Sequence, residues 1–357
     1  MEKILQLRII DIIPETTEAY SFVLEDIEGN DIHYKAGQFL TLIFIINNRE
    51  VRRSYSISST SGVNEKLQIS VKRVHNGEIS RHLIDHYSVG DIVEAIAPSG
   101  MFVLNEGSYE NKDVILLAAG SGITPMISVI KELLYKRSAN SVVLMYQNRS
   151  VQTTIFRSEI EKIATDFSTK FHWLDFRSSD QEDAFYRRLN NEKLEMLIPG
   201  YIKYDPAKTS FFICGPESFM RMCQFTVTLM GFDSKQIRKE HFVIDKPPAP
   251  PLIINPQPAK VTILQQHISF ETMYPKTILQ SALDQHIALP YSCKGGRCST
   301  CVATCVSGEV IMSMNDVLTE KDMKAGLILT CVGYAVTDIA LEYSTDAAGK
   351  DNRLQHV

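Results

Sequence analysis

The chain has 357 residues, of which 44% are hydrophobic and 22% are charged, a balance typical of a folded protein with two or three domains. Its formal net charge of −5 offers no basic field for nucleic acid, and it contains no run of about 18 apolar residues that could span a membrane. The N-terminal residues lack the apolar core of a signal peptide, and seven cysteines, an odd number, are typical of a reducing compartment, so we expect a cytoplasmic protein.

Residues 1–108 contain short apolar segments that alternate with polar residues and are separated by glycine, proline, asparagine and aspartate. The candidate strands are residues 4–10, 20–24, 39–45, 67–72 and 92–96. Such short strands with regular turn signals predict an antiparallel β-barrel or sandwich.

Residues 109–246 show a different sequence pattern, in which apolar candidate strands alternate with stretches whose apolar residues have helical spacing. The candidate strands are residues 114–118, 142–146, 171–174 and 210–214, and residues 125–137 carry a helical pattern. This alternation predicts an α/β domain with a parallel sheet.

A glycine-bearing loop follows the first strand of that domain, with the sequence Gly120, Ser121, Gly122, Ile123, Thr124 and Pro125. Thr124 could cap the following helix and Pro125 suits its first turn. The backbone N–H groups of such a loop and the helix dipole favour a pyrophosphate, although a purely structural turn is the alternative. The last strand runs into a second glycine loop at Cys214, Gly215 and Pro216, and both loops are expected at the carboxyl edge of the sheet, where ligands bind.

A proline-rich segment at residues 247–258 holds six of the 14 prolines and predicts an extended linker. It separates the α/β domain from a third domain, residues 259–357, in which four cysteines have a characteristic spacing. Cys293 and Cys298 are separated by four residues, Cys298 and Cys301 by two, and Cys331 lies far downstream. This is the spacing of a plant-type [2Fe–2S] cluster, in which one loop supplies three thiolates and a distant residue the fourth. Structural zinc and disulfides are the alternatives; zinc sites usually pair short CxxC knuckles, and nothing else suggests secretion.

The chain resembles the ferredoxin–NADP(+) reductase family in the arrangement with a C-terminal plant-type ferredoxin domain, and especially the reductase subunits of phenylacetyl-CoA epoxidase and related oxygenases. The resemblance covers residues 4–345 and rests on the order of short motifs: Arg53 to Ser56, Gly77 to Ser80, Gly120 to Pro125, Cys214 to Pro216, and the cluster loop. It implies a flavin-binding antiparallel β-barrel, an NAD(P)-binding α/β domain and a β-grasp ferredoxin domain.

The resemblance also implies roles for individual residues. Arg53 can pair with a flavin phosphate, Tyr55 can stack on the isoalloxazine, and Ser56 can hydrogen-bond near its redox edge; without the resemblance, a half-buried strand tyrosine and a solvated arginine would be the simpler interpretation. The pyrophosphate-binding stretch is Gly77, Glu78, Ile79 and Ser80, and Ser54 lies within the first motif. Cys214 is expected beside the nicotinamide, and Tyr55, Ser56 and Cys214 are the expected catalytic residues. Cys331 matches the fourth cluster ligand, so Cys305 and Cys223 are expected to pack in hydrophobic cores. We expect FAD rather than FMN, because the barrel and its Gly77–Ser80 motif are complete.

NADPH is the expected nucleotide, with NADH as the alternative. An NAD site usually offers an acidic side chain to the ribose 2′-hydroxyl, whereas arginine suits a 2′-phosphate. Arg149 follows the second strand of the α/β domain, in a segment with no acid in reach, and Arg177 and Ser178 follow the third strand. The alternative is that either arginine is a solvated surface charge.

The sequence therefore predicts a reductase that passes electrons from NADPH through FAD and a [2Fe–2S] cluster to a partner protein, with an oxygenase such as phenylacetyl-CoA epoxidase as the expected partner. The partner is expected to dock near Lys294 and Arg297. Two alternatives are open: a reductase for another acceptor, such as hybrid-cluster protein, or a ferredoxin-like carrier or redox sensor with a vestigial reductase half.

Overall fold

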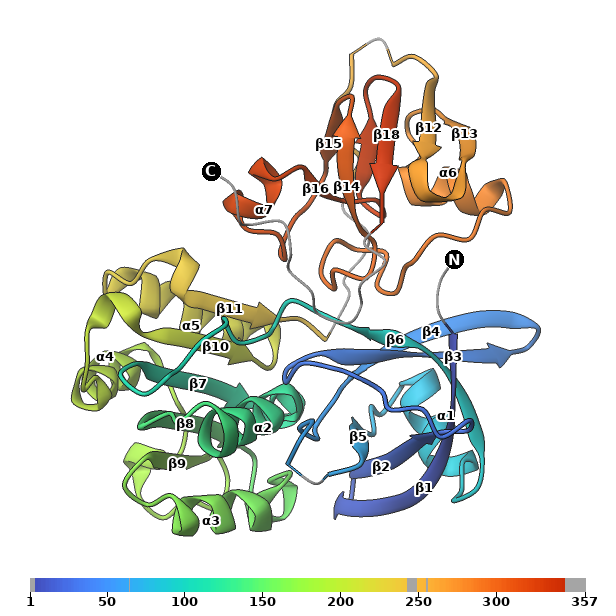
Figure 1. Cartoon of the computed structure of the whole chain (residues 1–357). Coiled ribbons are helices and arrows are strands. Elements are labelled where there is room, and N and C mark those ends of the chain that lie inside the picture. Colours follow the sequence, from blue (N-terminus) through green and yellow to red (C-terminus); the bar gives the residue numbers. More distant parts are fainter. Residues whose placement is uncertain (1–3, 64, 243–248, 255, 344–357) are drawn as a thin grey trace.

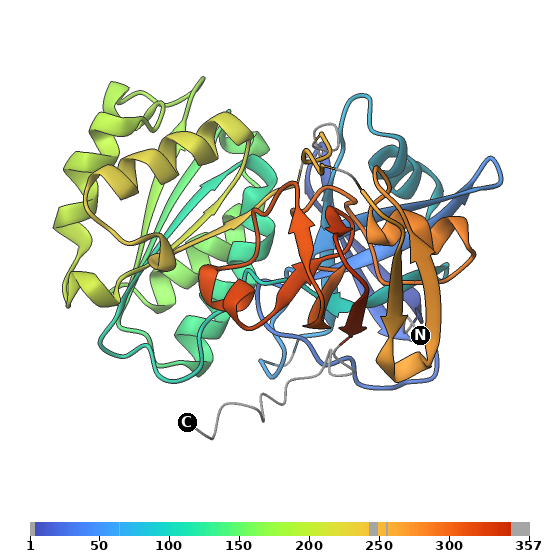
Figure 2. The same cartoon turned by 90° about the horizontal axis from the view of Figure 1, so that it is seen from above.

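The computed structural model describes residues 4–63, 65–242, 249–254 and 256–343, which form three folded units in chain order (Figure 1). An antiparallel unit comes first, a parallel α/β unit second and a small mixed-sheet unit third. Viewed from above, the third unit lies over the boundary between the other two (Figure 2). No helix in the described part of the chain has the length and apolar character needed to cross a membrane.

The first unit is a six-stranded antiparallel sheet in the order β4-β3-β6-β1-β2-β5. Its strands are β1 (Ile4–Thr16), β2 (Ala19–Asp26), β3 (Phe39–Ile46), β4 (Arg49–Ser56), β5 (Leu67–Lys72) and β6 (Ile92–Ser99). A bridge between Ile57 and Ile69 joins the two edges of the sheet, which closes it into a barrel. Helix α1 (Glu78–His86) covers one end and buries Ile79 and Leu83 against the barrel core. The expected antiparallel barrel is confirmed.

Strand β4 was not among the predicted strands, because its sequence is rich in arginine and shows no apolar run. It is held instead by continuous pairing with β3, from Arg49 opposite Ile46 to Ser56 opposite Phe39. Tertiary pairing with an apolar neighbour thus overrides a weak local strand preference.

The second unit is a parallel sheet in the order β11-β10-β7-β8-β9, with helices on both faces. Its strands are β7 (Asp113–Ala119), β8 (Ser141–Asn148), β9 (Phe171–Arg177), β10 (Ser210–Cys214) and β11 (Ile237–Glu240). Its helices are α2 (Ile123–Lys131), α3 (Arg157–Asp166), α4 (Asn191–Tyr201) and α5 (Glu217–Leu229), and α2 continues as a π-helical turn over Glu132–Lys136. Alternate residues of β7 enter two separate cores, one on each face, which is why this strand is apolar throughout. The predicted α/β domain is confirmed.

The third unit is a five-stranded sheet in the order β13-β12-β18-β14-β16, with β12 and β18 parallel at its centre. Its strands are β12 (Ala259–Ile263), β13 (Ile268–Thr272), β14 (Val302–Ser307), β16 (Leu327–Leu329) and β18 (Ile339–Glu342), and β15 (Val310–Met312) pairs with β17 (Gly333–Ala335). Helix α6 (Ile278–Asp284) buries Ile278, Leu279 and Ala282 in its core, and α7 (Glu320–Lys324) precedes β16. In the predicted linker, residues 247, 248 and 255 lie outside the described residues, and the described ones have no helix or strand.

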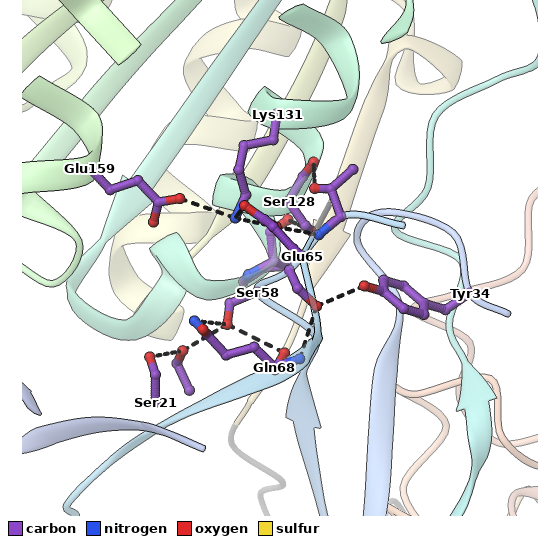
Figure 3. Close-up of polar contacts among 12 residues, drawn as sticks. Ser21, Tyr34, Ser58, Glu65, Gln68, Ser128, Lys131 and Glu159 are labelled. Atoms are coloured by element: carbon purple, nitrogen blue, oxygen red, sulfur yellow. Dashed lines mark hydrogen bonds and ion pairs between the residues drawn. The ribbon is translucent and has the colours of Figure 1, made fainter. Parts of the chain in front are cut away.

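An ion cluster around the buried Lys131 joins the first two units (Figure 3). The ammonium of Lys131, on α2, lies 2.9 Å from Glu65 of the barrel and 3.1 Å from Glu159 of α3, and its side chain is 6% exposed. Nearby, the Thr60 hydroxyl donates to the backbone carbonyl of Ser128 on α2. Separating the barrel from the α/β unit would leave the buried Lys131 charge without Glu65, which is costly, so these contacts resist separation of the two units.

Candidate functional site

The four predicted cluster cysteines converge at one edge of the third unit. The backbone N–H of Cys293 donates to Cys298 Sγ at 3.4 Å, and that of Gly295 donates to Cys293 Sγ at 3.4 Å. Hydrogen bonds from the Cys298 and Cys331 thiols lower the pKa of Cys293, and bonds to Cys293 and then Cys301 raise the pKa of Cys331. The four thiols therefore form one connected group.

The fold explains how the loop reaches this arrangement. Gly296 has a left-handed φ of 73°, a conformation that glycine adopts without steric cost. Thr330 donates through both its backbone N–H and its hydroxyl to the carbonyl of Cys301, which fixes Cys331 beside the loop. Four free thiols, two of which accept from backbone N–H groups, fit a [2Fe–2S] cluster.

The two remaining cysteines of interest lie outside this group. The Cys305 thiol donates to the carbonyl of Ser307 at 3.3 Å and packs only partly against the core. Cys223 is buried in α5. Neither is placed to ligate the cluster.

The first flavin motif lies on β4. Arg53 is exposed and donates to the carbonyl of Arg52 at 2.8 Å, whereas Tyr55 packs half-buried against the barrel core. Burial raises the pKa of Tyr55, against a smaller lowering by Arg53. A neutral aromatic ring beside an exposed guanidinium fits a flavin and its phosphate.

The second flavin motif forms the N-terminus of α1. Gly77 is the N-cap, no side chain caps the helix, and a Cβ at Gly77 would lie 2.5 Å from Ser80 Oγ. The helix start is tied to β4 by an ion pair between Glu78 and Arg49 at 3.6 Å. Uncapped N–H groups at a helix N-terminus next to a glycine form a cradle that fits a pyrophosphate.

The two glycine loops of the α/β unit pack directly against each other. Strands β7 and β10 are neighbours, with Cys214 opposite Ala118, and a Cβ at Gly122 would lie 2.1 Å from the carbonyl oxygen of Cys214. Only glycine permits this approach. The prediction that Thr124 caps the helix is wrong: α2 begins at Ile123 with Gly122 as N-cap, and the Thr124 hydroxyl donates to the carbonyl of Ser121 at 3.0 Å.

The barrel and the α/β unit meet at a buried carboxyl that the sequence patterns did not indicate. The Ser56 hydroxyl donates to Glu240 Oε2 at 3.3 Å, and Glu240 lies opposite Cys214 in the register of β10 and β11. Burial raises the pKa of Glu240 to about 8, and the hydrogen bond from Ser56 lowers it by less. The pKa of Cys214 is also raised, mainly by burial and to a smaller extent by the charge of Glu240. Ser56 and Cys214, both predicted, thus come together with Glu240. A single acid at the end of a four-residue strand carries no pattern that could have revealed it.

The predicted 2′-phosphate residues have different surroundings from those expected. Arg177 is held by Asp175 and by Asp180, each at 3.2 Å, and its side chain is 17% exposed. Asp180 also accepts from the backbone N–H of Val151 at 2.8 Å. An acid is therefore within reach of the segment after β8, contrary to the prediction. Arg149 is exposed, and the N–H of Ser178 donates to the carbonyl of Asn148 at 3.1 Å.

The cluster loop faces the other units rather than open solvent. Arg297 pairs with Asp316 at 3.2 Å and its side chain is 12% exposed, so it offers little surface to a partner; docking near Lys294 and Arg297 stays a prediction. Lys294 is exposed, and its ammonium lies 4.5 Å from the ring centroid of Tyr291.

Three family models match consecutive parts of the chain. They are an oxidoreductase FAD-binding domain at residues 5–104, an oxidoreductase NAD-binding domain at residues 116–224, and a 2Fe-2S iron-sulfur cluster binding domain at residues 261–336. Each match falls on one of the three units and includes the predicted site residues of that unit, whereas Glu240 lies between the second and third matches.

Relatives that match along nearly their full length include components of oxygenase systems. The chain is 32% identical to the ferredoxin reductase component of 3-ketosteroid-9-alpha-monooxygenase from Mycolicibacterium smegmatis, covering 94% of this chain and 95% of the relative. It is 30% identical to one of the subunits of 1,2-phenylacetyl-CoA epoxidase from Escherichia coli, covering 88% and 90%. Among solved structures, phthalate dioxygenase reductase matches with a TM-score of 0.59 and 26% identity, covering 95% of this chain and 98% of that structure.

Proposed function

Because this chain belongs to the family of NAD(P)H-dependent reductase components that combine FAD-binding, NAD-binding and [2Fe–2S] domains, we propose a specific assignment of its three sites. Arg53 to Ser56 and Gly77 to Ser80 hold FAD. The loops at Gly120 to Pro125 and Cys214 to Pro216 hold the nicotinamide nucleotide. Cys293, Cys298, Cys301 and Cys331 hold the cluster.

When bound, the nicotinamide, the flavin and the cluster would supply the redox chemistry, namely hydride donation, electron storage and one-electron transfer. The protein supplies position and exclusion of water. Gly122 lets the two nucleotide loops meet, and Cys214, fully buried at the end of β10, supplies an apolar wall. Below about pH 8 the carboxyl of Glu240 holds a proton beside the Ser56 hydroxyl, so the pair can exchange a proton without admitting solvent.

One observation carries this proposal. Ser56, at the end of the flavin strand, meets Glu240 and Cys214, at the carboxyl edge of the nucleotide sheet, through a buried contact of 3.3 Å. That is the place where a doubly wound sheet binds its ligand. The two motif sets, separate in sequence, therefore share one site.

The proposed electron acceptor is the oxygenase component of a multicomponent system in the cytoplasm. The relatives from a ketosteroid monooxygenase and from phenylacetyl-CoA epoxidase have nearly equal identity to this chain, 32% and 30%, so identity alone favours neither substrate. Phenylacetyl-CoA epoxidase is the acceptor that we would test first. Seven cysteines without a disulfide suit a reducing compartment.

Anaerobic titration of the purified full chain with NADPH tests the assignment. We expect bleaching of the flavin band followed by the electron paramagnetic resonance signal of a reduced [2Fe–2S] cluster. Delivery of electrons to an oxygenase component, measured as coupled substrate oxidation, then identifies the acceptor. A chain whose flavin does not respond to either nicotinamide nucleotide would contradict the proposed function and leave the carrier alternative.

A further inference from the structure

Strand β4 presents alternate side chains to two different parts of the molecule. Arg53 and Tyr55 belong to the proposed flavin site, whereas Glu50, Arg52 and Ser54 contact residues 291–292 of the third unit. Since successive side chains of a strand point to opposite faces, one strand can serve both partners at once.

Arg52 is the centre of the contact on the second face. Its Nη1 donates to the carbonyl of Tyr291 at 3.2 Å, and its guanidinium carbon lies 4.0 Å from the centroid of the Tyr291 ring. Its Nε donates to Glu50 Oε1 at 2.7 Å, and the Tyr291 hydroxyl donates to the same oxygen at 3.1 Å. The three side chains form a closed triangle. The Arg52 side chain is 10% exposed and that of Glu50 41%, so the guanidinium is largely shielded whereas the two hydrogen bonds to Glu50 lie at the surface.

Two hydroxyl contacts lie even closer to the cluster cysteines. The hydroxyls of Ser54 and Ser292 are 2.6 Å apart, and Ser292 directly precedes Cys293. On the other side of the loop, the Thr300 hydroxyl lies 3.5 Å from that of Ser99 on β6 and accepts from Cys298 Sγ at 3.5 Å. The loop that carries the sulfurs is thus held from both sides by oriented polar groups of the barrel.

We propose that Glu50, Arg52 and Tyr291 form an interdomain latch that holds the cluster loop against the flavin strand and thereby sets the rate of electron transfer between them. This inference rests on the proposed flavin and cluster sites. Each passage would move one electron, so the reduced flavin would lose one electron and the cluster would gain one. A second passage would follow only after the protein acceptor has taken the first electron from the cluster. The three latch residues are positioning residues, because none of them is assigned to either bound group.

The physical reason is that domains of one chain move relative to each other unless their interface is large and apolar. The contacts between β4 and the loop are polar and few, so their geometry determines what fraction of molecules has the cluster docked. The observed transfer rate is proportional to that fraction. Weakening the latch should slow transfer to the cluster without changing either bound group.

The test compares Tyr291→Phe and Arg52→Gln in the full, cofactor-loaded chain. Tyr291→Phe removes the hydroxyl that donates to Glu50, whereas Arg52→Gln removes the charge that joins all three residues. After mixing with NADPH, we expect flavin bleaching at the wild-type rate and cluster reduction slowed about threefold and about tenfold, the latter corresponding to about 1.4 kcal/mol. Hydrogen–deuterium exchange in residues 291–300 should rise in the same order. The electron paramagnetic resonance spectrum of the dithionite-reduced cluster should be the same in both variants as in the wild type.

Glu50→Ala, alone and combined with Tyr291→Phe, completes a double-mutant cycle. Because each change removes the hydrogen bond between the Tyr291 hydroxyl and Glu50, the slowing in the double variant should be less than the product of the two single effects. Tyr135→Phe and Arg8→Gln are matched controls, since Tyr135 packs against Phe167 and Arg8 pairs with Glu25, both away from the loop.

Wild-type cluster reduction and wild-type exchange in both Tyr291→Phe and Arg52→Gln would overturn the latch. Loss of flavin from Arg52→Gln would overturn the separation of the two faces of β4, and the latch with it. These results differ from failure of the proposed function, which would appear as a wild-type chain whose flavin is not bleached by nicotinamide nucleotide.

Discussion

Replacing Glu240 with glutamine tests the buried carboxyl where the barrel meets the α/β unit. Burial raises the pKa of Glu240 from its ordinary value of 4.5 to about 8. Between these values the folded chain keeps a proton that the unfolded chain has released, so this group's stabilising contribution is complete below pH 4.5 and is lost as the pH rises towards 8. The difference between the two pKa values corresponds to about 5 kcal/mol over the whole interval.

Glutamine has nearly the shape of the protonated carboxyl and does not ionise. Relative to the wild type, Glu240→Gln should therefore gain roughly 2 to 3 kcal/mol of stability between about pH 5.5 and about pH 7.5. For a unit of this size, that is a relative rise of about 7 °C in the melting temperature. A chain with three units need not unfold in one step. The melting temperatures of the wild type and Glu240→Gln are therefore compared with each other at each pH, by calorimetry on the cofactor-loaded protein.

Glu195→Gln is the control, since Glu195 is exposed on α4 and should show no such dependence. If the difference in melting temperature between wild type and Glu240→Gln were the same at both pH values, the carboxyl would titrate normally. The proton exchange proposed between Glu240 and Ser56 would then be wrong.

The remaining predictions concern the cluster, the nucleotide and the glycine loops. Cys298→Ser should abolish the cluster signal whereas Cys305→Ser should keep it, measured as iron and labile sulfide per chain; an essential Cys305 with a dispensable Cys331 would refute the ligand set. NADPH should be preferred over NADH, and Arg149→Ala should weaken this preference more than Arg177→Ala, because Arg177 is already paired with two carboxylates. Equal kcat/KM for both nucleotides, unchanged by either variant, would refute the assignment of a 2′-phosphate site to these arginines. Gly122→Ala should destabilise the chain by about 2 kcal/mol and impair nucleotide binding, since its Cβ would lie 2.1 Å from a carbonyl oxygen. A Cβ at Gly200 would meet nothing within 4 Å, so Gly200→Ala is the control and should have neither effect. Calorimetry and nucleotide titration test this, and wild-type behaviour of Gly122→Ala would refute the close approach of the loops.

Elements with a strong local pattern were predictable from the sequence. Strand β10 has the predicted bounds, Ser210–Cys214, because a fully buried strand is apolar at nearly every position. Strand β4 was missed because its stability comes from pairing with β3, and Glu240 because its pKa depends on burial by segments distant in the chain. Likewise, Asp180 reaches Val151 only through the packing of two loops, which spacing does not reveal. Motif order indicated which residues act together; long-range packing decided how they meet.

The central claim is that electrons enter at the flavin and leave through the four-cysteine cluster. The most direct test is Cys331→Ser in the full chain, mixed anaerobically with NADPH and then with the oxygenase component. The account predicts flavin bleaching at the wild-type rate, continued reduction of an artificial acceptor that takes electrons from flavin, and loss of oxygenase turnover. Oxygenase turnover equal to that of the wild type, in a chain shown to lack the cluster signal, would contradict it.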